Sequence, residues 1–163
     1  MELIIVRHGK AEPHGHPGGD GERVLVEKGW KQARQVGEML KATAFLPRLV
    51  LTSPLARARQ TAEAMCESAG IAGPVVQGWL SCGMTPETAV AELAAYADFE
   101  RVAIVGHEPD LSELAAWLLG TTGGVVEMKK GAVAAFRVGS PGHYGDLLFL
   151  LPPRFIGSGD FAD

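Results

Sequence analysis

The chain has 163 residues, of which 47% are hydrophobic and 21% are charged. This length suits one compact domain with a single core, and this composition excludes a disordered or low-complexity protein. We therefore expect one domain over residues 1–163. The longest apolar runs, residues 115–119 and 147–151, fall well short of the roughly 18 residues that a membrane-spanning helix needs, so we expect no membrane anchor.

The formal net charge of -4 and the first residues narrow the class further. A chain without a surplus of basic residues is poorly suited to the phosphate backbone of nucleic acids, so we expect no nucleic-acid partner. The acidic Glu2 stands where a secretory signal carries positive charge, and the apolar stretch is too short for such a signal, which indicates a cytoplasmic protein. We expect both cysteines, Cys66 and Cys82, to be free thiols.

The first third of the chain predicts two strands, a long loop and a helix. Continuous runs of apolar residues predict buried strands over residues 2–6 and 49–52. Residues 9–23 are rich in Gly, Pro, His and Asp without apolar periodicity, which predicts a surface loop of a length that is usually functional. Apolar residues recur at every third or fourth position over residues 27–41, the pattern of an amphipathic helix.

Two further helix starts are marked by a hydroxyl residue followed by proline. Ser53 before Pro54, and Thr85 before Pro86, offer a side-chain oxygen that can cap the first turn. The proline then takes the first helical position, where its missing N–H costs nothing. These pairs predict helices that end near residue 68 and near residue 96.

The second half of the chain predicts the remaining strands and one more helix. Asp110, with Glu113 three residues later, resembles a capping box and predicts a helix through residue 119. From about residue 153 we expect a loose tail. Short apolar runs predict strands over residues 75–77, 101–105, 131–138 and 145–151, of which the last two form a hairpin.

Strands that alternate with helices indicate an α/β fold, a three-layer sandwich with a mostly parallel central sheet flanked by helices. In such sheets a ligand binds beyond the carboxyl ends of the strands. Residues directly after the strands are therefore expected to meet, whatever their separation in the sequence.

Basic and imidazole side chains follow three of these strands. Arg7 and His8 follow the first strand, Arg57 lies in the helix start after the second, and His107 follows the fourth. Such a cluster would repel itself unless an anion lay in its middle, and a phosphoryl group suits two guanidinium groups with imidazole donors. We expect Gly9 to leave room beside this pocket. The sequence therefore predicts a phosphate site.

Arg7-His8-Gly9 directly after the first strand resembles the signature of the histidine phosphatase superfamily, whose fold is phosphoglycerate mutase-like. In one further matching segment, residues 25–33, Val26 stands where that family usually has threonine. The short chain and Gly-His-Glu-Pro-Asp-Leu at residues 106–111 most resemble its small SixA-type branch, the phosphohistidine phosphatases. The other matching segments are residues 25–33 (LVEKGWKQA), 53–61 (SPLARARQT) and 105–109 (VGHEP).

The resemblance implies that His8 attacks phosphorus and becomes transiently phosphorylated, and a neutral imidazole nitrogen is a competent nucleophile near neutral pH. Arg7, Arg57 and His107 match the other phosphate-pocket positions, where they would hold the phosphoryl group in line and bear its charge. The resemblance implies no metal and no other cofactor. We expect orthovanadate, tungstate and inorganic phosphate to inhibit competitively.

The proton donor for the leaving group stays open. Relatives that cleave phosphate esters often place a carboxylic acid after the third strand, and the corresponding residues 79–83 contain none. Either the substrate is a phosphohistidine, whose imidazole leaves already protonated, or Glu108 supplies the proton from its place beside His107. A third interpretation is that Glu108 only stabilises the start of the following helix through the helix dipole.

We predict a phosphatase that acts on phosphohistidine in a phosphorylated protein, because short connections leave the pocket open to a protein surface. One alternative is a phosphomonoesterase or mutase of the same superfamily that acts on a small phosphate ester. A mutase must hold its phosphorylated intermediate away from water, and no lid is evident. A second alternative, from another class, is a non-catalytic module that docks phosphoproteins.

Four residues near the predicted site receive no role in it. Arg59 lies two positions after Arg57 and is expected in solvent or in a salt bridge. His14 and His16 lack the further ligands of a metal site and are expected in a solvated loop. Cys82 has no basic neighbour in the sequence and is expected to be structural.

Overall fold

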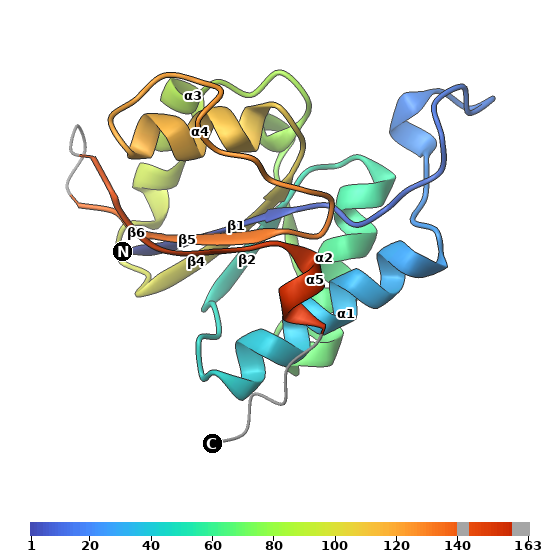
Figure 1. Ribbon diagram of the computed structural model, residues 1–163, viewed down its shortest axis with the longest axis horizontal. Helices are drawn as coiled ribbons and strands as arrows, with labels where there is room; N and C mark the ends of the chain where they lie inside the picture. The colour runs from blue at the N-terminus through green and yellow to red at the C-terminus, as the bar shows by residue number, and fades with distance from the viewer. Residues whose placement is uncertain (140–143, 158–163) are drawn as a thin grey trace.

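The computed structural model describes residues 1–139 and 144–157, which form a six-stranded sheet with helices on both faces (Figure 1). The strands are β1 (Glu2–Arg7), β2 (Leu49–Thr52), β3 (Val75–Val76), β4 (Arg101–Gly106), β5 (Val133–Arg137) and β6 (Asp146–Leu151). The α-helices are α1 (Glu27–Ala42), α2 (Ala56–Ala69), α3 (Pro86–Leu93), α4 (Asp110–Leu118) and α5 (Pro153–Ile156). Short 3-10 turns are η1 (Asp20–Glu22), η2 (Gly78–Leu80) and η3 (Ala94–Tyr96).

The sheet has the strand order β3-β2-β4-β1-β5-β6. Its first four strands are parallel neighbours, whereas β5 runs antiparallel to β1, and β6 antiparallel to β5. Helices α3 and α4 cover one face, and α1, α2 and α5 cover the other (Figure 1). The predicted α/β sandwich with a mostly parallel central sheet is confirmed, and so is the hairpin that precedes α5.

Side chains of β1 alternate between two hydrophobic cores. Leu3 and Ile5 pack with the residues of α3 and α4, whereas Ile4 and Val6 pack with those of α1 and α2. All four are at most 1% exposed. Because helices cover both faces, the four positions between Glu2 and Arg7 are all apolar, which explains the continuous run in the sequence.

One of the two predicted hydroxyl caps is correct and the other is wrong. The Thr85 side chain accepts a hydrogen bond from the backbone N–H of Thr88, and Pro86 is the first residue of α3. In contrast, α2 begins at Ala56, beyond both Ser53 and Pro54. The Ser53 hydroxyl accepts a hydrogen bond from the N–H of Leu55, so it stabilises the turn that leads into the helix instead of its first turn.

The predicted capping box of α4 is also wrong. Asp110 is the first helical residue, and its carboxylate accepts hydrogen bonds from the N–H groups of Gly83 (2.8 Å) and Met84 (3.1 Å) in a distant loop. The carboxylate of Glu108 instead accepts a hydrogen bond from Ser112 in the first turn of the helix, at 3.1 Å. Asp110 therefore ties two segments together and Glu108 serves the helix start.

The segment from residue 153, expected as a loose tail, begins with the ordered helix α5. Ile156 of this helix is 3% exposed and packs in the core with α1 and α2. Residues 158–163 lie outside the described part of the chain. Among the described helices, none is both long and apolar enough to span a membrane.

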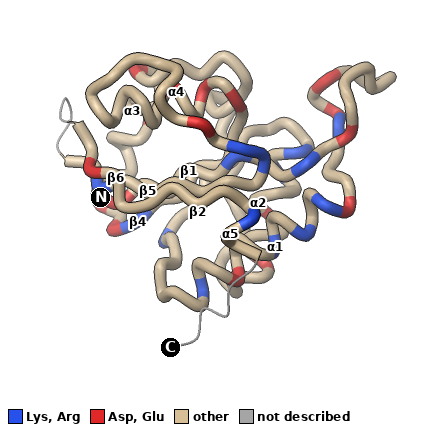
Figure 2. Tube along the Cα trace, in the orientation of Figure 1, with Lys and Arg blue, Asp and Glu red and all other residues tan. Residues whose placement is uncertain are grey.

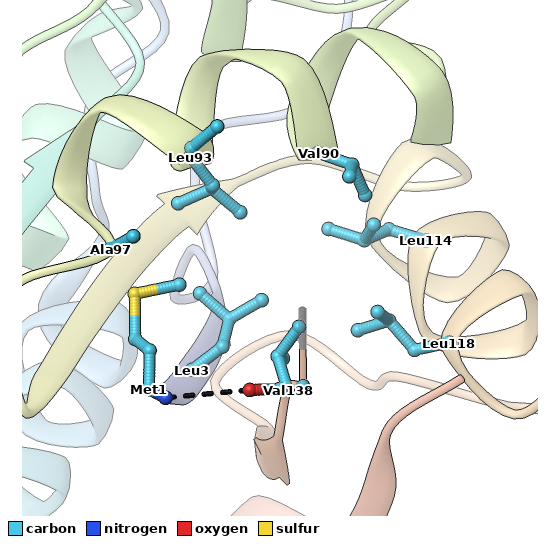
Figure 3. A pocket seen from close by; sticks show the side chains of 10 residues that line it. Met1, Leu3, Val90, Leu93, Ala97, Leu114, Leu118 and Val138 are labelled. Atoms are coloured by element: carbon cyan, nitrogen blue, oxygen red, sulfur yellow. Dashed lines mark hydrogen bonds between the residues drawn. The ribbon is translucent and has the colours of Figure 1, made fainter. Parts of the chain in front are cut away.

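An apolar cavity of about 420 Å³ lies between α3, α4 and the amino end of β1 (Figure 3). Leu93 and Leu114 line it from the two helices, and Leu3 lines it from the sheet. No titratable side chain is among its lining residues. The cavity is at the opposite end of β1 from His8, so the chemistry must be sought elsewhere.

Candidate active site

The carboxyl ends of β2, β4 and β1 lie side by side, and each is followed by a polar residue. Ser53, His107 and His8 come directly after these strands. Backbone hydrogen bonds continue the sheet into the site: the N–H of His8 donates to Gly106 O (3.1 Å), and the N–H of Ser53 donates to Val105 O (3.0 Å). The rings of His8 and His107 are therefore close, with centroids 5.3 Å apart.

His8 is buried at the end of β1, with 5% of its surface exposed. Its Nδ1 lies 2.8 Å from the Gly9 carbonyl oxygen, and because a carbonyl can only accept, Nδ1 carries the ring proton. The lone pair is then on Nε2, which accepts a hydrogen bond from Nε of Arg57 at 3.3 Å. Burial, aided by repulsion from His107 and both arginines, lowers the pKa of His8 to about 3. At neutral pH His8 is an uncharged imidazole with an available lone pair.

Glycine is required at position 9 for a different reason from the predicted one, which was to leave space beside the pocket. A Cβ at this position would lie 2.6 Å from the carbonyl oxygen of Gly29 in α1, so the glycine permits close backbone packing. The Gly9 N–H donates to the hydroxyl of Thr61 in α2 at 3.0 Å. Contacts with two helices thus fix the backbone that carries the Nδ1 partner of His8.

Arg57 lies in the first turn of α2 and is 3% exposed. Besides its contact with His8, it donates from Nη1 to the Asp20 carbonyl oxygen (2.8 Å) and from Nη2 to the Asp20 carboxylate (3.0 Å). The guanidinium therefore joins Nε2 of His8 to an anionic side chain. Asp20 thus accepts from both terminal nitrogens of Arg57, the two-pronged donor geometry that also suits a phosphoryl group.

Asp20 and Arg23 are site residues that the sequence did not identify. Arg23 is 5% exposed and donates from Nε to the Asp20 carboxylate at 2.8 Å. This hydrogen bond, together with attraction from Arg57, lowers the pKa of Asp20 to about 2. Both residues lie in the 9–23 loop, where no periodicity marks a site, and only the expectation that such a loop is functional pointed to them.

His107 is 2% exposed and contacts the hydroxyl of Ser53, with 2.8 Å between Nε2 and Oγ. Burial, with repulsion from Arg57, lowers the pKa of His107 to about 4, so this ring is also neutral at neutral pH. Its Nδ1 is buried and has no hydrogen-bond partner within residues 1–139 and 144–157. A buried polar atom of this kind costs free energy until a ligand or water satisfies it.

Arg7 is held by the segment that precedes β5, because its Nη1 donates to the Met128 carbonyl oxygen at 2.7 Å. Its buried Nε has no partner in the described part of the chain. Burial lowers the pKa of Arg7, and the Glu108 carboxylate partly opposes this. The structure thus brings the predicted residues His8, Arg57, His107 and Arg7 to one end of the sheet.

Glu108 is half-buried beside this group. Burial raises its pKa, although the hydrogen bond from Ser112 and the charge of Arg7 act in the opposite direction. Two interpretations of Glu108 therefore have structural support: it contacts the start of α4, and its carboxyl group holds a proton to higher pH than an ordinary glutamate. A raised pKa is the property that a general acid needs.

The four residues that were given no role have contacts of their own. Arg59 is half-exposed and pairs with Glu63 at 3.7 Å, as expected. His14 and His16 contact carboxylates of their own loop. Cys82 is exposed as a residue, and its sulfur lies 3.8 Å from Nη2 of Arg57, nearer the site than the sequence suggested. Partial burial of the sulfur raises the pKa of the thiol.

The two site histidines give a prediction for stability against pH. Each binds a proton in the folded protein only below a pKa of about 3 (His8) or about 4 (His107), whereas the ordinary value is 6.5. Between these values the unfolded chain binds more protons, so the free energy of unfolding falls as the pH is lowered from 6.5 towards 4. Urea unfolding at several pH values measures this slope.

We expect a shallower slope in a variant with both His8→Asn and His107→Asn. The double variant His14→Asn with His16→Asn is the matched control, because both of these side chains lie in the surface loop. An unchanged slope in the first variant would contradict the assignment of two buried neutral imidazoles.

This chain is similar to one protein family and one further protein in sequence, and to two solved structures in fold. The family model of the histidine phosphatase superfamily (branch 1) matches residues 3–78. An uncharacterized protein of Picosynechococcus sp. is 35% identical over 167 residues, which cover 96% of this chain and 99% of that protein. The structure of the protein histidine phosphatase SixA complexed with tungstate has a TM-score of 0.86 at 25% identity, covering 96% of this chain and 99% of that one. A SixA structure from Agrobacterium tumefaciens has a TM-score of 0.79 at 22% identity, covering 93% and 97%.

Proposed function

This chain belongs to the histidine phosphatase superfamily, in its SixA-type branch, and from this premise we propose that it hydrolyses phosphohistidine on proteins. The observation that carries the proposal is the state of His8. Its ring is buried and neutral, its proton is on Nδ1, and its Nε2 lone pair faces the guanidinium of Arg57. A nucleophile and an anion clamp are therefore in direct contact.

The reaction we propose has two displacements at phosphorus. Nε2 of His8 first forms a bond to phosphorus while the bond to the nitrogen of the substrate histidine breaks. Water then attacks the same phosphorus, releases orthophosphate and restores the neutral ring of His8. Arg7, Arg57 and His107 bear the charge of the phosphoryl oxygens in both steps, and those oxygens replace Asp20 at the Arg57 guanidinium.

The surroundings of the leaving group favour phosphohistidine. The segment after β3 reaches the site, since Cys82 contacts Arg57, and residues 79–83 contain no carboxylate. The carboxylate of Asp110, which also touches this segment, already accepts two backbone N–H groups. An imidazole can leave without a strong acid, whereas an alkoxide needs one.

A small phosphate ester is the second candidate substrate, and one observation favours it. Burial raises the pKa of Glu108 beside the site, which gives a group that could protonate an alkoxide. A Glu108→Gln variant tests whether this carboxyl group supplies that proton.

A phosphohistidine peptide tests the proposal directly. We expect the wild-type protein to release orthophosphate from it much faster than from the same peptide carrying phosphoserine. Tungstate should compete with the peptide, because it presents the same oxygens to the clamp. Faster release from phosphoserine would reject protein phosphohistidine as the substrate.

Arg57→Lys and Arg59→Lys form a matched pair in one helix. Lysine offers a point charge in place of a two-pronged donor, so we expect Arg57→Lys to lower turnover of the peptide by on the order of 10²-fold and to weaken inhibition by tungstate. Arg59→Lys changes an exposed residue that pairs with Glu63 and should retain wild-type turnover. Equal activity of the two variants would show that Arg57 does not hold the phosphoryl group.

A further inference from the structure

The lysines and arginines of this chain fall into two groups: those with a carboxylate oxygen within 4.0 Å, and those without one in the described residues. Arg23, Arg48, Arg57, Arg59, Arg101, Lys129 and Arg137 have carboxylate partners. The other cations have no ion pair within the described residues. Two of them are Arg7 of the phosphate pocket and Lys41 in the last turn of α1. The remaining six, which we call the basic track, are Lys10, Lys28, Lys31, Arg34, Lys130 and Arg154.

Lys10 and Lys130 are held at the mouth of the site by one side chain. Gln32 accepts a hydrogen bond from the Lys10 N–H (2.9 Å) and donates to the Lys130 carbonyl oxygen (3.1 Å). Gly131, directly after Lys130, donates to the carbonyl oxygen of His8 at 3.1 Å. The backbones of both lysines are thus fixed to the nucleophile, while their side chains are exposed.

Lys130 lies in the positive field of the pocket. Burial and repulsion from Arg7, Arg23, Lys10 and Arg57 lower its pKa. Figure 2 shows Lys and Arg segments gathered around the carboxyl end of β1 and along α1, in a chain whose net charge is -4. Cations that repel one another without carboxylate partners are best explained by an anion that comes from outside.

The rest of the basic track lines a groove that starts at Gln32. The groove has a volume of about 680 Å³ and runs between α1 and α5, and Gln32 is one of its lining residues. Lys28, Lys31 and Arg34 follow at intervals of three along one face of α1, and Arg154 lines the groove from α5. Like charges at this spacing destabilise a helix, and Glu27 is the one acidic residue in the lining.

We propose that the basic track binds acidic residues of the substrate protein that lie next to its phosphohistidine. This inference rests on the proposed function, because a phosphohistidine is part of a polypeptide and the neighbouring residues of that polypeptide must lie beside the pocket. Gln32 connects the mouth of the site to the groove, so an extended segment that enters the pocket with its phosphoryl group continues along α1. Carboxylates on that segment complement the lysine and arginine side chains in charge.

Three peptides test the inference. One phosphohistidine peptide carries several glutamates on one side of the phosphohistidine, a second carries them on the other side, and a third has glutamine at all these positions. We expect the wild-type kcat/KM for one of the acidic peptides to exceed that for the glutamine peptide by about tenfold at low salt, and the preference to vanish at about 0.5 M salt.

Substitutions show which residues cause the preference for the acidic peptide. Lys10→Gln with Lys130→Gln, and Lys31→Gln with Arg34→Gln, should each reduce the tenfold preference to about twofold or less. Lys41→Gln, on the same helix but outside the track, should keep it. Because the glutamine peptide reports turnover without carboxylates, its kcat/KM should change little in the Lys31→Gln, Arg34→Gln protein, which also shows that this variant is folded.

The outcomes separate this inference from the function on which it rests. If no peptide releases orthophosphate, the proposed function fails. If all three peptides are hydrolysed equally, or if the track variants keep the preference, only the basic track is rejected. Stronger competition by a single-stranded oligonucleotide than by an unphosphorylated acidic peptide would also overturn the assignment to a protein partner.

Discussion

We expect His8→Ala protein to release no measurable orthophosphate from a phosphohistidine peptide, a loss on the order of 10⁴-fold or more. The reason is covalent: removal of the imidazole removes the atom that receives the phosphoryl group. Arg57 would still attract the substrate, but its other contacts in the described residues are the Asp20 oxygens and the Cys82 sulfur, and none of them is an imidazole nitrogen. Steady-state release of orthophosphate measures this loss.

The intermediate gives a second readout. Brief incubation of the wild-type protein with ³²P-labelled substrate, quenched without acid, should leave label on the protein that is lost in acid and retained in alkali. Such a bond is a phosphoramidate. His16→Ala, in the surface loop, is the control and should retain both label and turnover.

Two outcomes bear on the assignment. Label of the same stability in His8→Ala protein would place the covalent step on another residue. His8→Asn, which fills more of the buried space than alanine, should be equally inactive, and agreement between the two variants rules out a collapsed site as the cause.

The sequence was sufficient to predict the sheet because β1 and β4 are covered on both faces. Their central residues, 3–6 and 102–105, all face one core or the other, which leaves continuous apolar runs that stand out from the rest of the chain. The meeting of His8 with His107 was predictable for a related reason. Both residues follow neighbouring parallel strands, so the sheet itself places them together.

Other parts of the site depend on tertiary contacts that leave no local pattern. Ser53 has the sequence signature of a helix cap, and its real partner, His107, is 54 residues away. Asp20 lies in a loop without periodicity, and its contact with Arg57 depends on how that loop folds back over α2. Gly9 was expected to give space to a ligand, but its requirement comes from the backbone of Gly29. In each case the residue type suggested a role, but the sequence did not show which residue it contacts.

The choice between the two candidate substrates depends on one side chain, Glu108. Its carboxylate accepts a hydrogen bond from Ser112 at the start of α4, and burial raises its pKa. A glutamine in its place can still accept from Ser112 through its amide oxygen, but it cannot deliver a proton. Glu108→Gln therefore separates the helix contact from acid catalysis.

If Glu108 is the leaving-group acid, we expect Glu108→Gln to lower hydrolysis of an alkyl phosphate by on the order of 10²-fold or more and hydrolysis of a phosphohistidine peptide far less.

Because the acid must be protonated, wild-type ester hydrolysis should fall as the pH rises through the raised pKa of Glu108, and the variant should lack this fall. Glu113→Gln, an exposed change in α4, is the control for the pH profile and for unfolding in urea. Equal small losses on both substrates would leave Glu108 as a helix contact alone, since the retained acceptor for Ser112 preserves α4. Equal large losses with unchanged stability would mean that the Glu108 charge instead positions Arg7, whose guanidinium it attracts and which serves both substrates alike.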